Sequence, residues 1–115
     1  MTQPQQLSSP LYKLLRGEQT STFNQQKPAS GMIDLVGGDF RGLDLRGLDA
    51  SRLDLNNAYF RGADLRGIDF REANLEGASI AHAQISGAYF PVELEASEVL
   101  MSMQFGTRMR YRRQP

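Results

Sequence analysis

Large apolar residues recur at every fifth position through the middle of the chain. From Leu35 to Phe90 this series has twelve positions, and all except Ala50 hold a large apolar side chain. A period of five fits neither an α-helix nor a β-strand, whose side chains repeat every 3.6 and every two residues. The pattern therefore predicts a backbone that turns within each five-residue unit over residues 33–92.

The other positions of the unit are also regular. The residue before the large one is Asp in seven of the twelve units, the residue two before it is often Ala, and Gly often stands two after it. Residues 63–67 read Ala-Asp-Leu-Arg-Gly, and residues 73–77 read Ala-Asn-Leu-Glu-Gly. Each unit should point two side chains inward, one small and one large, and three outward. Gly gives the backbone the freedom that a corner needs.

These two units resemble the A(D/N)Lxx pattern of the pentapeptide-repeat family, and the resemblance covers about residues 33–92. It implies an all-β fold, a right-handed quadrilateral β-helix in which four units form one coil of the solenoid. About three coils follow, with a height of ~15 Å at the ~4.8 Å spacing of neighbouring strands. The first coil departs most from the family, because Leu43, Leu48 and Leu53 replace the usual Ala. We read Leu48 beside Ala50 as a volume-conserving exchange.

Residues 1–32 are predicted to form an N-terminal capping segment. Residues 8–17 favour a short helix, with Ser at its N-cap, Pro at its first turn and Gly after its end. Residues 18–31 are polar and predicted to be irregular, with Phe23 as an anchor. Such a cover is expected because the open end of a short stack exposes unpaired backbone and apolar core.

Residues 93–115 are predicted to form a C-terminal helix and a basic tail. The helix should span residues 95–105 and end at Gly106, with Ala96, Val99, Leu100 and Met103 in one apolar stripe. After it, apolar and arginine positions alternate over residues 107–112, which indicates an extended arm. The helix either covers the last coil of a monomer or joins two copies into a homodimer.

Composition narrows the classes of function. The chain has no cysteine and a formal net charge of zero, which excludes disulfides and thiolate metal sites and gives no global signal for nucleic acid. No stretch reads as a signal peptide or as the ~20 apolar residues of a membrane span. We therefore expect a cytoplasmic protein.

No constellation of residues indicates catalysis. The single histidine, His82, falls on an outward position without a Ser or Cys partner, so we interpret it as a surface residue. The regularly spaced aspartates belong to the repeat and should all point away from the core. The glycines do not form a phosphate-binding loop. We predict no enzyme, no cofactor, no metal site and no small-molecule substrate.

The outward positions are where binding is expected. The arginines after the repeat centres form either a lattice neutralised by nearby aspartates or a striped face that docks a protein partner. The predicted function is a non-catalytic interaction module, or adaptor, with an unidentified protein partner. The candidate partner-binding residues are Arg41, Arg46, Arg61, Arg66, Arg71, Met101, Met103, Phe105, Arg108 and Arg110.

Two alternatives come from the family and from the tail. Some pentapeptide-repeat proteins protect DNA gyrase, a topoisomerase, by imitating the acidic rod of duplex DNA. A β-helix about 15 Å tall, whose acidic surface is interrupted by arginines, should be a poor mimic of a duplex that rises ~34 Å per turn. The arginines of residues 108–113 indicate weak nucleic-acid binding, but a charged chain end is more often only solvated.

Overall fold

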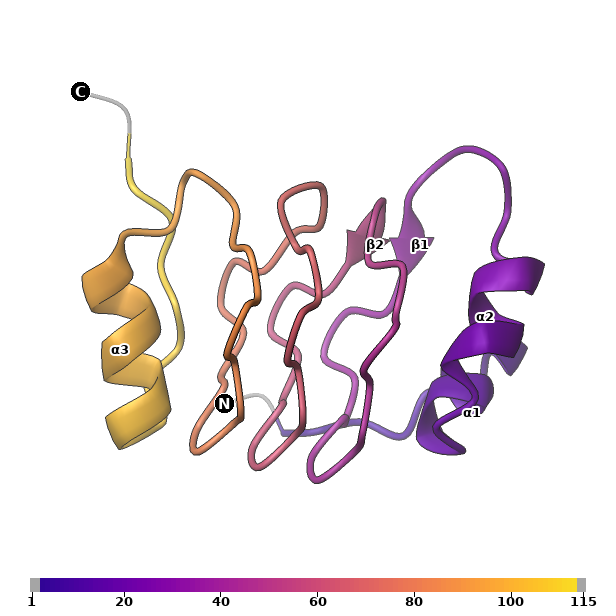
Figure 1. Cartoon of the computed structure of the whole chain (residues 1–115), viewed down its shortest axis with the longest axis horizontal. Helices are drawn as coiled ribbons and strands as arrows, with labels where there is room; N and C mark the ends of the chain where they lie inside the picture. Colours follow the sequence, from indigo (N-terminus) through magenta and orange to yellow (C-terminus); the bar gives the residue numbers. More distant parts are fainter. Residues whose placement is uncertain (1–2, 114–115) are drawn as a thin grey trace.

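The computed structural model describes residues 3–113 and places helices at the two ends of a stack of short turns (Figure 1). The described elements are α1 (Pro10–Arg16), α2 (Thr20–Gln26), β1 (Ile33–Asp34), β2 (Leu53–Asp54) and α3 (Ala96–Phe105). The helices α1 and α2 lie at one end, and α3 lies at the other.

Parallel backbone pairing joins residues that are twenty positions apart. Ile33 in β1 lies opposite Leu53 in β2, and Tyr59 is bridged to Asp39 on one side and to Ser79 on the other. Residues 33–52, 53–72 and 73–92, here called the first, second and third segments, therefore lie side by side. Regular strands are only two residues long because each five-residue unit turns before a longer strand can form.

The large residues of the repeat fill the interior. The ring centroids of Phe40 and Phe60 stack at 5.2 Å, and those of Phe70 and Phe90 stack at 5.9 Å. Like residues meet because a twenty-residue register brings every fourth unit into the same column. Leu48 and Ala50 are both buried, as the proposed exchange requires. The core along the segments is therefore the one that the five-residue period predicts.

The aspartates of the repeat have a structural role that the sequence did not reveal. The side-chain oxygens of all seven, and of Asn74, accept the backbone N–H two residues later. Such a bond stabilises the turn locally, which explains why the repeat prefers Asp or Asn at this position.

Among the repeat aspartates Asp39 alone is buried, although its carboxylate pairs with the exposed Arg41 as an outward residue does. This residue is only 6% exposed. Its carboxylate accepts hydrogen bonds from the amide of Gln6 and the guanidinium of Arg41, and its carbonyl accepts one from the Tyr12 hydroxyl. Gln6 and Tyr12 of the N-terminal region therefore cover Asp39 through long-range contacts that the repeat pattern does not contain.

The helix α1 agrees with the prediction. Ser9 at its N-cap accepts a hydrogen bond from the Tyr12 backbone N–H, and Pro10 occupies the first turn. Gly17 follows its end. Tyr12 and Leu15 are buried against the first segment, where the Tyr12 ring meets Phe40 edge to face at 5.5 Å.

The prediction that residues 18–31 are irregular is wrong, because Thr20–Gln26 forms α2. Phe23 is completely buried, as expected of an anchor. The polar side chains that made this stretch look irregular bind the edge of the first segment: Asn24 donates to the Gly47 carbonyl at 2.8 Å, and Lys27 donates to the Asp49 carbonyl at 3.0 Å. They replace the backbone partners that a further segment would have supplied.

The helix α3 covers part of the other end. It ends at Gly106, whose φ of 72° lies in the left-handed region that glycine favours. The predicted stripe is only partly correct, because Ala96 and Leu100 are exposed, whereas Val99 and Ser102 are buried. The Ser102 hydroxyl accepts the Ile80 backbone N–H at 2.9 Å. A polar residue therefore faces the stack because the last segment presents unpaired backbone groups.

The tail after α3 runs along the edge of the third segment. Met109 is fully buried and exchanges backbone hydrogen bonds with Gly77 and Ala78, at 2.7 and 2.8 Å. The side chains of Arg110 and Arg112 are exposed, in agreement with the predicted alternation. Among residues 3–113, no helix has the length and apolar character needed to cross a membrane.

Candidate binding surfaces

Four of the candidate arginines are paired with the aspartate two positions earlier. The closest guanidinium–carboxylate distances are 2.8 Å for Arg41–Asp39, 2.7 Å for Arg46–Asp44, 2.7 Å for Arg66–Asp64 and 2.8 Å for Arg71–Asp69. In each pair the Nε and one terminal nitrogen reach the two carboxylate oxygens. The short i, i+2 spacing suits this forked geometry because the Asp-capped turn brings both side chains to one corner.

On the face around Arg46 and Arg66, these pairs neutralise the charges of the side chains locally. Arg46 also reaches across to Asp64 in the next segment at 3.3 Å. Hydrogen bonds from the paired guanidinium hold the pKa of Asp44 and that of Asp69 at about 2, below the usual 3.8. The geometry on this face favours the neutralised lattice, whose exposed pairs each contribute little to stability.

Arg61 occupies the same repeat position but lies in a different environment. Tyr59 stands where its aspartate partner would be, and within residues 3–113 the Arg61 side chain makes no hydrogen bond and no ion pair. It lines a hollow of about 570 Å³ together with Arg41, Arg108 and Tyr59. We call this feature the Arg61 hollow. It brings together three of the arginines selected from the sequence.

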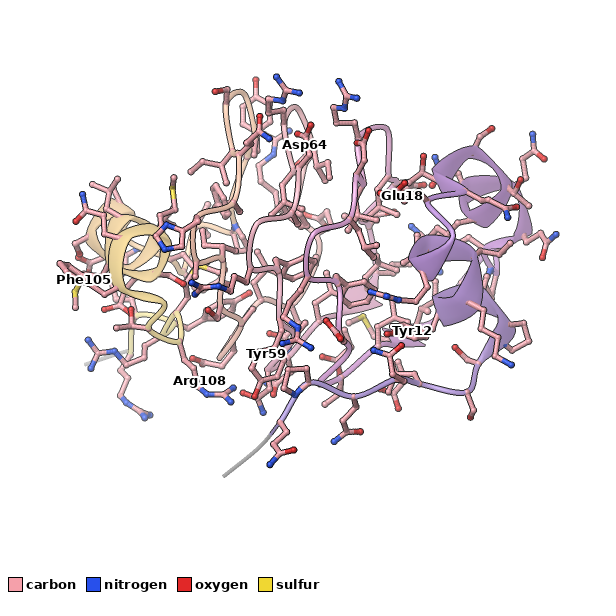
Figure 2. The ribbon with its side chains drawn as sticks, turned by 90° about the horizontal axis from the view of Figure 1, so that it is seen from below. Tyr12, Glu18, Tyr59, Asp64, Phe105 and Arg108 are labelled. Atoms are coloured by element: carbon pink, nitrogen blue, oxygen red, sulfur yellow. The ribbon has the colours of Figure 1, made fainter. Side chains whose placement is uncertain are left out.

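The tail positions one wall of the Arg61 hollow. The Arg108 guanidinium lies 5.2 Å from the ring centroid of Tyr59 and donates to the Tyr59 hydroxyl at 2.6 Å. Figure 2 shows these two side chains close together and on the side of the stack away from Asp64. The sequence reasoning missed Tyr59, although its interruption of the Asp column was a visible signal.

The second notable surface is apolar and lies at the α3 end. Five large apolar residues at this end are strongly exposed, with values of 57% for Tyr89, 76% for Val92, 54% for Leu100, 42% for Met101 and 73% for Phe105. Beside them is a hollow of about 370 Å³, here called the apolar groove, whose lining residues are Ile85, Phe90, Leu94, Ala96, Val99 and Leu100. The groove exists because α3 leaves part of the third segment uncovered.

The structure separates the remaining candidates. Met101 and Phe105 lie on the exposed side of α3, whereas Met103 is half-buried against the core. Arg110 is paired with Glu98 at 2.8 Å, which lowers the pKa of Glu98 through the hydrogen bonds that the guanidinium donates. Arg71 is exposed and also lies 4.7 Å from the ring centroid of Tyr89.

His82 is exposed, as predicted for an outward position. Within residues 3–113 there is no group of three or more histidine, cysteine, aspartate or glutamate side chains placed to hold a metal ion. Burial raises the pKa of Tyr111, whose hydroxyl accepts the Leu75 backbone N–H and thus helps to fix the tail.

The comparisons with known proteins agree with the repeat seen in the structure. A family model described as pentapeptide repeats, in eight copies, matches residues 33–62 and 54–90, which together span half of the chain. A search of curated proteins gave no match, and neither did a search of solved structures. The five-residue period, the twenty-residue pairing register and the family match point to the same conclusion: the chain belongs to the pentapeptide-repeat family.

Proposed function

We propose that this protein is a non-catalytic interaction module that docks another protein at its α3 end. The observation that carries the proposal is the concentration of exposed apolar side chains over residues 89–105, beside the apolar groove. An exposed apolar patch with a polar rim is typical of a protein-binding surface. The family match supports the proposal, because a repeat solenoid has its binding residues on its surface.

The proposal includes a fold, a right-handed, four-sided β-helix of about three coils. The twenty-residue register supports this form, since four five-residue units then complete one coil. In that form the sides are covered by outward polar residues, and the ends are where apolar surface can meet a partner. The N-terminal end is already covered by α1 and α2, which leaves the α3 end.

Charge at the rim of the apolar groove indicates the chemistry of the partner. Glu93 and Glu95 are exposed and lie next to the groove residues Leu94 and Ala96. A complementary partner would present an amphipathic segment with apolar side chains for the groove and lysine or arginine beside them. The paired arginines on the sides of the stack remain predicted binding residues, but their guanidinium groups already have carboxylate partners.

The test is affinity capture from cells that naturally contain the protein, with matched variants as bait. The variant Leu100→Gln plus Phe105→Gln removes apolar surface at the α3 end. Met32→Gln plus Val36→Gln removes exposed apolar side chains at another place, where they are 60% and 38% exposed. A partner captured by the wild type and by the control variant, but lost with the α3 variant, supports the proposal. Glu93→Gln plus Glu95→Gln should weaken its binding.

Two outcomes contradict it. Capture that persists with the α3 variant, or that is lost only with Arg46→Gln plus Arg66→Gln, assigns binding to the sides of the stack instead. Light scattering that gives twice the mass of the chain, and a return to the single mass with the α3 variant, assigns this surface to a homodimer.

A further inference from the structure

The Arg61 hollow forms because the three segments carry different residues in the same two columns. Backbone hydrogen bonds place Arg41, Arg61 and Ala81 in one column, and bridges place Asp39, Tyr59 and Ser79 in the next. In the third segment these columns hold the small residues Ser79 and Ala81 instead of the larger residues of the first two segments, and this leaves open space. Both Ser79 and Ala81 line the hollow.

Arg61 lines the hollow, and its guanidinium is not bound to any carboxylate of the described residues. Arg66 stands at the equivalent position one unit later and is held by Asp64 at 2.7 Å, whereas Arg61 has no hydrogen-bond or ion-pair partner within residues 3–113. The Tyr-for-Asp replacement at position 59 removes the carboxylate without removing the arginine. The site therefore has a cationic group that can bind an anion without first breaking an existing pair.

Arg108, which also lines the hollow, is fixed by contacts that do not depend on a ligand. Its guanidinium donates to the Gly77 carbonyl at 3.1 Å, to the Asn57 side chain at 3.2 Å and to the Tyr59 hydroxyl at 2.6 Å. Arg41 is held by Asp39, two positions earlier in the same segment. Two of the three guanidinium groups are thus oriented before binding, which reduces the entropy lost when a ligand is bound.

We propose that the Arg61 hollow binds a phosphate group, and that its preferred ligand is a small organic phosphate monoester. Arginines from the first segment, the second segment and the tail, three separate parts of the chain, line the hollow. A tetrahedral phosphate has three oxygens that can accept from separate directions, whereas a carboxylate has two oxygens in one plane. Pro4, Ala81 and the Tyr59 ring supply apolar lining for the organic part of the ligand.

This site lies on the side of the stack and goes beyond the proposed docking at the α3 end. Neither proposal requires the other, because the residues of the Arg61 hollow and those of the apolar groove do not overlap. The probes are therefore small molecules, which report on the hollow without any protein partner.

The experiment is calorimetric titration of the full chain with phenyl phosphate, inorganic phosphate and benzoate at low salt. Phenyl phosphate should bind at least tenfold more tightly than benzoate, which has the same ring with a carboxylate. Arg61→Gln should weaken phenyl phosphate binding at least tenfold. Arg66→Gln removes an arginine from the same repeat position outside the hollow and should leave binding unchanged. Because Arg61 is exposed and unpaired, thermal unfolding should show that its variant folds normally.

The relative affinities distinguish the sources of the phosphate group. Phenyl phosphate that binds more tightly than inorganic phosphate supports an organic monoester, and equal binding of the two supports the phosphate group with free phosphate as the ligand. No measurable binding of either probe overturns the proposal. Benzoate that binds as tightly as phenyl phosphate, or an Arg61→Gln variant with wild-type affinity, overturns it as well.

Discussion

The aspartate before each large apolar residue combines a local and an electrostatic role. Its carboxylate accepts a backbone N–H in the turn and, in four units, also binds the arginine two positions later. Asn74 makes the same backbone contact without a charge. The turn therefore needs only the side-chain oxygen, whereas the charge serves the arginine.

Stability should fall in acid through these carboxylates. The pKa of Asp44 and that of Asp69 are about 2 in the folded protein and near 3.8 ordinarily, so ionisation favours the folded state above about pH 4. This contribution is lost as the pH falls from about 4 towards 2. The double variant Asp44→Asn plus Asp69→Asn keeps the turn contact and should show a shallower loss of stability in that interval, measured by urea unfolding at a series of pH values. An unchanged pH profile would contradict this assignment.

At the scale of elements, each end is closed by side chains that bind the backbone of the adjacent segment. Asn24 and Lys27 of the α2 end bind carbonyl groups of the first segment, and Ser102 of α3 accepts an N–H of the third. An exposed edge of unpaired backbone favours association with other chains. The terminal helices therefore do more than cover apolar residues, because they also satisfy hydrogen bonds that stacking leaves open.

Replacement of Ser102 tests this role. Ser102→Ala leaves the Ile80 backbone N–H without its partner in a buried place, which should lower the free energy of unfolding by about 1–3 kcal/mol. Ser97→Ala is the matched control, since Ser97 is exposed on the same helix and its loss should change stability by less than about 0.5 kcal/mol. Urea unfolding of both variants measures the difference. Equal stability of the two variants would show that α3 contributes only apolar cover.

At the scale of the whole molecule, charge is distributed in neutral pairs and not as a continuous acidic surface. The described part measures 37 × 30 × 28 Å, including the helices at both ends. Four of the repeat aspartates are bound to arginines. A mimic of duplex DNA needs an extended negative field, which such pairing cancels locally.

We therefore predict that the protein does not protect DNA gyrase. In a supercoiling assay inhibited by a quinolone, addition of the protein should not restore activity at any concentration. A pentapeptide-repeat protein known to protect the enzyme serves as the positive control. Concentration-dependent rescue would establish the topoisomerase alternative and would show that charge pairing does not prevent mimicry.

Much of the molecule follows from local chemistry. The five-residue period, the buried columns of large residues and α1 with its Ser9 cap were predictable because each depends on residues close in sequence. The C-terminal helix was predictable for the same reason, since Gly106 ends an apolar pattern. Position 59 also carried a signal, because Tyr replaces Asp there, but the period alone did not say what the exception does.

Contacts between distant residues decided the rest. The sequence by itself determined the repeat and hence the family, because turn preference and burial act over five residues. Only the tertiary structure showed that α2 binds the edge of the first segment, that Asp39 is buried and that Ser102 faces the stack. It also placed Arg108 against Tyr59, forty-nine positions away, and so formed the Arg61 hollow. These features depend on which backbone groups remain unpaired after stacking, which a local pattern does not encode.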